Sequence, residues 1–287
     1  QRASEFVCLG TPKPGDVPMP YLLPKFKDVI AEPAVTLAKY GVVIRCRPIN
    51  PYARHPYRSI FSCAGKGYGE VVKAMPSDEV FTMWSPDDIC TKFAAFLEEA
   101  RQYYGDVPFR WLLKMGDIAN MYDELSLTAI SSSARQNMNE CFGATRGGRK
   151  IKHRGVTVNL VTREALLGCR RDDHDRYVPF DQLQNVCDFD NTHCWSQYKG
   201  RVYARELGAP MGGMVSPAKA VGTCGLVERG FTRELKDAGL IGGGIRVMDD
   251  VSLAVAYASR DEYEKAQQWC ARISGEGGYP APLMLKM

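Results

Sequence analysis

The clearest periodic patterns along the chain are those of amphipathic helices. Ser85-Pro86-Asp87-Asp88 predicts a helix start, because a serine cap, a proline in the first turn and two acids all favour a helix N-terminus. Apolar residues then recur on one face as far as Ala100. A long helix is predicted from Ser216 to Gly239, and a last helix begins at the capping box Ser259-Arg260-Asp261-Glu262.

Apolar runs between these helices predict strands. Phe109–Asp117 is one such run. Ile245–Met248 and Val251–Tyr257 form a predicted hairpin with Asp249-Asp250 at its tip. The mixed order of helices and strands is typical of an α+β fold.

The N-terminal third has a different character. Residues 1–24 are rich in proline and lack periodicity, so we expect an extended arm there. From Lys39 to Val72, basic residues alternate with apolar ones, which predicts two arginine-bearing strands near Val42–Ile49 and Tyr57–Ser62.

Composition places the chain among ordinary globular proteins. Its 287 residues are 45% hydrophobic and 24% charged, and its net charge of +4 permits a polyanionic partner without requiring one. No apolar run reaches the ~18 residues that a membrane helix needs, so we expect no membrane partner. The ten cysteines form no CxxC pair, which indicates buried thiols in a reducing, intracellular compartment. Nucleus, cytoplasm and organelle stay open. The spacing of Cys169, His174, Cys187, His193 and Cys194 fits no standard zinc pattern.

Paired acids are the first candidate chemistry. A tight hairpin prefers Asn-Gly or Asp-Gly, whereas Asp249-Asp250 adds like-charge repulsion that a divalent cation would relieve. Asp117 ends another apolar strand and supplies a third carboxylate. Carboxylates on neighbouring strands are what two-metal phosphoryl transfer needs. A solvated acidic turn is the plainer interpretation of the pair taken alone.

A glycine-rich loop lies between these acids. In Gly208–Ala218 the glycines allow a backbone to approach a flat object such as a nucleotide closely, and Ser216-Pro217 starts the following helix. An ordinary loop leading into a helix is the alternative.

The order of these motifs resembles the palm of reverse transcriptases. The shared features are a strand ending in Asp117, the Pro-x-Gly-x-x-x-Ser-Pro loop from Pro210, and the Met-Asp-Asp hairpin. Arg47-Pro48-Ile49 is similar to the fingers motif of that family. The segment Val186–Tyr203 looks like a strand pair of its Penelope-like and telomerase-like members. The resemblance covers about Lys39 to Met287.

The resemblance implies a right-hand polymerase whose antiparallel palm sheet packs on helices. Fingers would span residues 25–108 and the palm residues 109–287, with fingers elements interrupting at about 140–200. Few residues follow Asp250, so we expect the thumb to be absent or truncated. The remainder of a longer reading frame, or a partner subunit, would then supply it.

The resemblance also implies residue roles. Asp117, Asp249 and Asp250 match the catalytic acids that hold Mg²⁺, or Mn²⁺, together with the carbonyl of Ile118. The residues matched to nucleotide binding are Arg45, Arg47, Arg58, Lys66, Tyr122, Met211, Gly212 and Lys286. Tyr122 matches the aromatic residue that blocks a ribose 2′-OH. A shift of one residue, to Asp123, would instead favour an RNA polymerase.

The function that the resemblance implies is RNA-directed DNA synthesis. A primer 3′-OH would be extended with dNTPs on an RNA template, as in retroelements. A set of basic residues is expected to contact the template backbone: Arg146, Arg149, Lys150, Lys152 and Arg154. An RNA-dependent RNA polymerase and a non-catalytic, polymerase-like RNA-binding scaffold in a larger particle are the alternatives.

Overall fold

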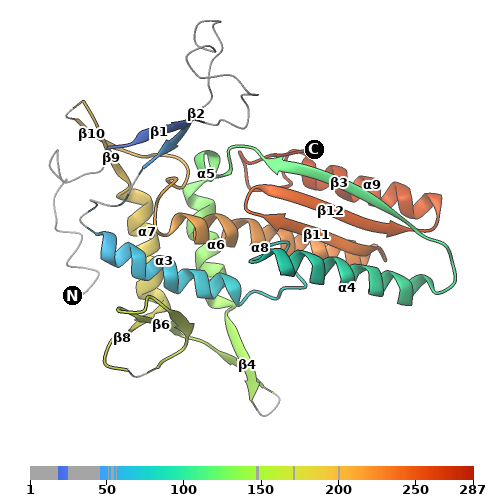
Figure 1. The fold of residues 1–287 in the computed structure, drawn as a ribbon, viewed down its shortest axis with the longest axis horizontal. Coiled ribbons are helices and arrows are strands. Elements are labelled where there is room, and N and C mark those ends of the chain that lie inside the picture. Colours follow the sequence, from blue (N-terminus) through green and yellow to red (C-terminus); the bar gives the residue numbers. More distant parts are fainter. Residues whose placement is uncertain are drawn as a thin grey trace, which may run out of the picture.

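A computed structural model of the chain provides the structure. It describes residues 19–24, 46–50, 52, 55, 57–146, 149–170, 172–199 and 201–287. Helices and antiparallel sheets alternate through these residues, which confirms the predicted α+β class (Figure 1).

The largest sheet has four antiparallel strands and lies on the right of the molecule in Figure 1. In spatial order its strands are β11 (Ile241–Val247), β12 (Asp250–Tyr257), β3 (Arg110–Ile118) and β13 (Leu285–Lys286). Strands from three separate parts of the sequence therefore meet in one sheet.

Helices cover the two faces of this sheet unequally. Two helices, α8 (Ser216–Asp237) and α9 (Arg260–Ser274), pack on one face, where Val255 is fully buried. On the other face, α4 (Pro86–Tyr104) brings Phe96 against β11 and β12. Burial of apolar side chains on both faces provides most of the stabilisation expected here.

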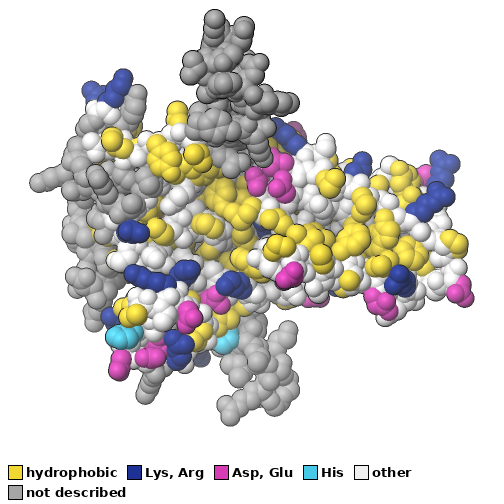
Figure 2. Space-filling model, in the orientation of Figure 1, with side chains coloured by type: hydrophobic (Ala, Val, Ile, Leu, Met, Phe, Trp, Pro, Cys, Tyr) yellow, Lys and Arg dark blue, Asp and Glu magenta, His cyan; other side chains and the backbone are white. Residues whose placement is uncertain are grey.

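One part of the second face stays open. Leu113 and Met115 on β3 are 58% and 78% exposed, although α4 covers the neighbouring strands. Figure 2 shows hydrophobic side chains at the surface in the region of the main sheet and α4. Residues alternate between faces along a strand, so Asp117 shares this open face with Leu113 and Met115.

A second core lies beside the first. Its helices are α3 (Arg58–Lys73), α6 (Leu127–Asn139) and α7 (Phe180–Thr192), packed around β6 (Gly155–Asn159). The remaining elements are β1 (Tyr21–Pro24), β2 (Cys46–Ile49), α5 (Met121–Glu124), β4 (Phe142–Arg146), β5 (Arg149–Lys152), β7 (Ala165–Leu167), β8 (Asp175–Pro179), β9 (Trp195–Tyr198) and β10 (Arg201–Ala204). Of these, β1 pairs with β2, so the end of the expected arm is a strand.

The helices predicted from their caps are confirmed. Ser85 and Ser259 each form a capping box at the start of α4 and α9. One predicted strand is wrong. Tyr57–Ser62 enters α3, because apolar residues from Phe61 onward recur at helical spacing and are buried. The strand pair expected within Val186–Tyr203 is present as β9 and β10, but it begins later than expected, because Val186–Asp190 lies inside α7.

Eight cysteines with described side chains are unpaired, but the predicted burial is wrong for Cys90 and Cys169, which are exposed. Five of them are buried: Cys141, Cys187, Cys194, Cys224 and Cys270. Burial raises the pKa of Cys187 to about 12, which keeps that thiol protonated. Within the described ranges, no helix has the length and apolar character to cross a membrane.

Candidate functional site

The strands that carry the predicted catalytic acids are neighbours in the main sheet. Asp117 of β3 lies directly opposite Asp250 of β12, so both side chains project from the same face. The Ile118 N–H donates to the Asp249 carbonyl at 2.8 Å. Pairs alternate along antiparallel strands, so Asp117 and Asp250 form the closer, non-hydrogen-bonded kind. Lys286 lies opposite Asp117 on its other side.

The hairpin that joins β11 to β12 turns at Met248 and Asp249. Val247 pairs with Asp250, which leaves only these two residues in the turn. Met248 has a φ of 57°, a left-handed backbone that costs a non-glycine residue about 1 to 3 kcal/mol. Asp249 is half-buried and Asp250 is exposed. The predicted hairpin is confirmed, but its turn lies one residue earlier than expected, with Asp249 in the turn and Asp250 at the start of β12.

The acids fit a metal ion in part. Two carboxylates on one sheet face repel each other, and oxygen ligands of this kind suit Mg²⁺. Among the described residues, no group of three or more His, Cys, Asp or Glu side chains is gathered closely enough to hold a metal ion. Asp117 and Asp250 therefore share one face of the sheet, and a ligand role for them, for Asp249 or for the Ile118 carbonyl stays a prediction.

The glycine loop contacts the strand that carries the predicted fingers arginine. The Asn50 N–H donates to the Met211 carbonyl at 2.8 Å. Gly212 has a φ of 94°, and a Cβ placed there would lie 2.8 Å from the Asn50 carbonyl oxygen. Only glycine suits this close approach. Asn50 follows β2 directly, so the backbone of Arg47 in β2 lies three residues from the loop contact; its side chain is outside the description.

The same loop contacts Tyr122 on its other side. The Ala209 N–H donates to the Tyr122 carbonyl at 2.7 Å. Tyr122 is half-buried, and burial together with the Asp249 carboxylate raises the pKa of its phenol to about 12. Asp123 pairs instead with Arg205 at 2.7 Å. Of the two candidates for the sugar position, Tyr122 is thus the one whose phenol pKa is raised by the Asp249 carboxylate.

Two other predicted nucleotide-binding residues lie on α3 and not on the glycine loop. Arg58 and Lys66 are exposed on α3. A Cβ at Gly65, next to Lys66, would lie 2.2 Å from the Met214 carbonyl oxygen, so this helix packs on the end of the glycine loop. Arg58 is eight residues away from Lys66, about 12 Å along the helix. Arg45 lies outside the described residues.

A buried polar network joins the start of α8 to neighbouring segments, and the sequence patterns did not reveal it. The Lys219 ammonium on α8 donates to the Asp190 carboxylate and to the Asn191 Oδ1, the latter at 2.7 Å. The Tyr52 hydroxyl donates to Asp190 at 2.8 Å. These contacts tie α8, α7 and the segment after β2 together. A lysine on the apolar side of a long helix was the only signal in the sequence.

The cations predicted to contact the template lie on and next to a β-hairpin formed by β4 and β5. Arg146, Arg149 and Lys150 lie in β4 and β5, and their side chains are outside the description. Lys152 and Arg154 are exposed. Figure 1 shows β4 extending away from the main sheet. The backbone of this hairpin therefore lies apart from the strands that carry the acids.

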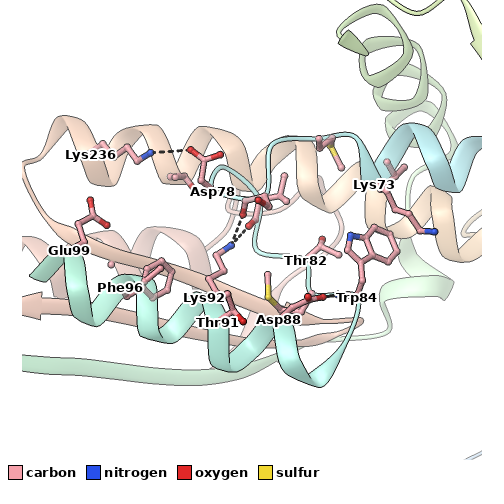
Figure 3. Close-up of a pocket in the computed structure, with 18 residues that line it drawn as sticks. Lys73, Asp78, Thr82, Trp84, Asp88, Thr91, Lys92, Phe96, Glu99 and Lys236 are labelled. Atoms are coloured by element: carbon pink, nitrogen blue, oxygen red, sulfur yellow. Dashed lines mark hydrogen bonds and ion pairs between the residues drawn. The ribbon is translucent and has the colours of Figure 1, made fainter. Parts of the chain in front are cut away.

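A separate cavity of about 410 Å³ lies between α4, α8 and the segment of residues 75–84 (Figure 3). Lys92 points toward that segment and donates to the Ser77 carbonyl at 3.1 Å and to the Val80 carbonyl. Burial lowers the pKa of Lys92 to about 8. Asp117 and the Asp249-Asp250 pair do not line this cavity.

No protein-family model and no curated protein matches the chain. Solved structures do resemble it. Telomerase from Candida tropicalis in complex with a TWJ fragment of telomeric RNA has a TM-score of 0.61 and 12% identity, covering 97% of this chain and 41% of the telomerase. A C. tropicalis apo telomerase truncated from its C-terminal domain has a TM-score of 0.56 and 10% identity, covering 92% and 48%.

Telomerase from Candida albicans in complex with a TWJ fragment of telomeric RNA is similar at a TM-score of 0.54 and 12% identity, covering 85% of this chain and 41% of that one. The chain thus spans less than half the length of each of these telomerases. At this identity the likeness concerns the fold. The chain has a nucleic-acid polymerase-like fold, similar to that of telomerases.

Proposed function

We propose that the chain is the catalytic part of an RNA-directed DNA polymerase. The observation that carries this proposal is the arrangement around the glycine loop. The loop contacts Tyr122 on one side and Asn50 on the other, while the charge of the Asp249 carboxylate acts on the Tyr122 phenol. The similarity to telomerase folds supports the same class. In this proposal the main sheet is the palm, and β2 and α3 belong to the fingers.

In the proposed reaction, a primer 3′-OH attacks the α-phosphate of a dNTP and pyrophosphate leaves. Asp117, Asp249, Asp250 and the Ile118 carbonyl would hold Mg²⁺ or Mn²⁺. When bound, the metal lowers the pKa of the attacking hydroxyl and neutralises charge on the phosphates.

The remaining residues position the nucleotide. The Tyr122 ring would occupy the space that a ribose 2′-OH needs, and the backbone at Met211 and Gly212 would line the new base pair. Lys286, opposite Asp117 in the sheet, would give a proton to the leaving pyrophosphate. The cations proposed to bind the triphosphate are Arg45, Arg47, Arg58 and Lys66. Guanidinium groups suit phosphate oxygens because they donate in pairs.

The proposed partners are an RNA template with its primer, bound in part by the β4–β5 hairpin. Exposed cations such as Lys152 and Arg154 bind phosphates without reading sequence. We further propose that a thumb from the rest of a longer chain, or from a partner subunit, completes the grip on the duplex. An intracellular, reducing compartment remains our proposal for its location.

Primer extension on an RNA template tests the function. Wild-type protein is supplied with dNTPs or rNTPs in Mg²⁺ or Mn²⁺, beside Asp249→Asn and the control Asp106→Asn, an exposed acid in the loop before β3. We expect dNTP extension by the wild type and the control, and none by Asp249→Asn. Undiminished extension by Asp249→Asn contradicts the mechanism.

The same experiment separates the two alternatives. Extension with rNTPs alone would assign the chain to RNA-dependent RNA polymerases. Folded protein that binds RNA but extends no primer in any condition would favour the non-catalytic scaffold.

A further inference from the structure

A fully buried arginine lies beneath the turn that carries Asp249. Arg246 is in β11, three residues before Asp249, and is 0% exposed. Its guanidinium forms a buried ion pair with both carboxylate oxygens of Glu228 on α8. It also donates to the Thr82 hydroxyl at 2.6 Å. Burial alone would lower the pKa of Arg246, but the Glu228 carboxylate raises it above its ordinary value.

The arginine also contacts the backbone of the turn. The Arg246 Nη1 donates to the Met248 carbonyl at 2.9 Å, and Met248 is the residue with the left-handed backbone. The next carbonyl, that of Asp249, accepts from the Ile118 N–H at 2.8 Å. Both carbonyls of the two-residue turn are therefore held by defined donors. Such contacts can hold a strained backbone in one conformation.

Other groups fix Glu228 in turn. The Phe81 N–H donates to its Oε2 at 3.0 Å, and the Tyr279 hydroxyl donates to its Oε1 at 3.2 Å. Glu228 lies on α8, the helix that begins directly after the glycine loop. One rigid helix thus links the predicted base-pair platform to the turn that carries the acids.

The buried ion pair between Arg246 and Glu228 is poorly explained by a contribution to folding stability. A buried ion pair is often no more stabilising than apolar side chains of the same volume, because both charges lose their hydration. An apolar residue in place of Arg246 would leave the Met248 carbonyl without its donor. We propose that Arg246, held by Glu228 and Thr82, is a positioning residue that fixes the Met248–Asp249 turn so that Asp249 can bind metal. This role deepens the proposed polymerase function and rests on it.

The test compares Arg246→Lys with two further variants. Arg246→Lys keeps the charge but loses the forked guanidinium. Thr82→Val is a milder change that removes a single contact to Arg246. Lys219→Met is the matched control, because it removes another buried cation of the same molecule, from an ion pair with Asp190. Melting temperatures show which variants stay folded. They also allow variants that lose the same amount of stability to be compared with each other.

Two readouts report on the turn without catalysis. Hydrogen exchange of the Ile118 amide and of the peptide spanning residues 246–250 should be roughly five- to tenfold faster in Arg246→Lys, and less so in Thr82→Val. Mn²⁺ affinity, followed by electron paramagnetic resonance, should fall roughly 10- to 100-fold in Arg246→Lys, as when groups behind metal ligands are altered. Lys219→Met should match the wild type in both.

Kinetics complete the comparison. We expect Arg246→Lys to lower kcat with little change in the KM for dNTPs, because the turn rather than the nucleotide pocket has moved. If Arg246→Lys and Lys219→Met have equal melting temperatures and also show the same hydrogen exchange and Mn²⁺ affinity, the positioning role is overturned, even in an active polymerase. A folded wild type that binds RNA but extends no primer counts against the proposed function. The exchange comparison then still decides whether Arg246 holds the turn.

Discussion

Asp117 on β3 and Asp250 on β12 lie directly opposite each other as a non-hydrogen-bonded pair. Like charges in such a pair destabilise a sheet, because their side chains are closest there. Lys286 on β13 flanks Asp117 and offsets part of this repulsion. The metal ion of the proposed function would relieve the repulsion between the two carboxylates.

The variant Asp250→Asn should therefore gain stability while it loses activity. Removing one negative charge from the pair is expected to raise the free energy of unfolding by about 0.2 to 1 kcal/mol. Primer extension should fall at least 100-fold, because an amide is a poor ligand for Mg²⁺. Thermal unfolding and extension rates measure the two effects. Asp106→Asn, which alters an isolated exposed loop position, should change neither, and a destabilised Asp250→Asn would contradict the argument.

Tyr122 is expected to control the choice of sugar by its ring. Tyr122→Ala should raise the preference for rNTPs over dNTPs roughly tenfold or more, because the space for a 2′-OH opens. Tyr122→Phe should keep the wild-type preference. With a pKa of about 12, the phenol stays neutral at working pH and takes no part as an acid or base. The ratio of kcat/KM for paired dNTP and rNTP substrates measures this, and equal behaviour of the two variants would refute a steric role.

Gly212 is expected to be intolerant of any side chain. Gly212→Ala places a Cβ 2.8 Å from the Asn50 carbonyl oxygen at a φ of 94°. The left-handed backbone alone costs an L-residue about 1 to 2 kcal/mol, so both stability and dNTP affinity should fall. Gly230→Ala in α8 is the control, since a Cβ there meets nothing within 4 Å. That change should stabilise the helix by about 0.5 to 1 kcal/mol. Equal melting temperatures for the two variants would contradict the close approach.

Local signals explain what could be predicted from the sequence. The capping boxes at Ser85 and Ser259 involve residues three apart, so the starts of α4 and α9 could be placed without tertiary structure. Likewise, the apolar runs around Asp117 and Asp249 mark strands that do pair as neighbours of one sheet. Alternating arginines misled the prediction near Arg58, because burial of one helical face outweighs local strand propensity.

Contacts between residues that are far apart in the chain could not be predicted from the sequence. No pattern in the sequence pairs Arg246 with Glu228, or Lys219 with Asp190, because each partner lies on a separate element. The contact between Gly212 and Asn50 joins residues far apart in the chain. A buried charge can be noticed in a sequence, but its partner becomes visible only in the fold.

The Lys92 cavity predicts a pH dependence of stability. The pKa of Lys92 is about 8 in the folded protein, below its ordinary value of 10.5. Between these values the unfolded chain binds more protons than the folded one, so raising the pH favours the folded state. Below pH 8 both states are protonated, and the burial penalty is felt in full. The stability of the wild type relative to Lys92→Met should therefore rise from pH 8 to 10.5, as measured by urea unfolding. A difference that is flat in pH would contradict the lowered pKa.

The β4–β5 hairpin predicts a salt-dependent grip on RNA. Lys152 and Arg154 are exposed at its base. If each contacts a phosphate, the double variant Lys152→Ala with Arg154→Ala should lower the slope of log K against log salt by about 1 to 2. The weakening should be similar for different RNA sequences, because phosphate contacts carry no base information.

The control for this experiment removes the same charge elsewhere. Arg260 and Lys265 are exposed on α9 and form surface ion pairs with Glu264 and Asp261. Their double replacement by alanine changes the net charge equally but should leave the salt slope unchanged. Fluorescence anisotropy with labelled single-stranded RNA at several salt concentrations measures both variants. Equal slopes for the two would mean that RNA responds to overall charge, and the hairpin would then lose its assigned role.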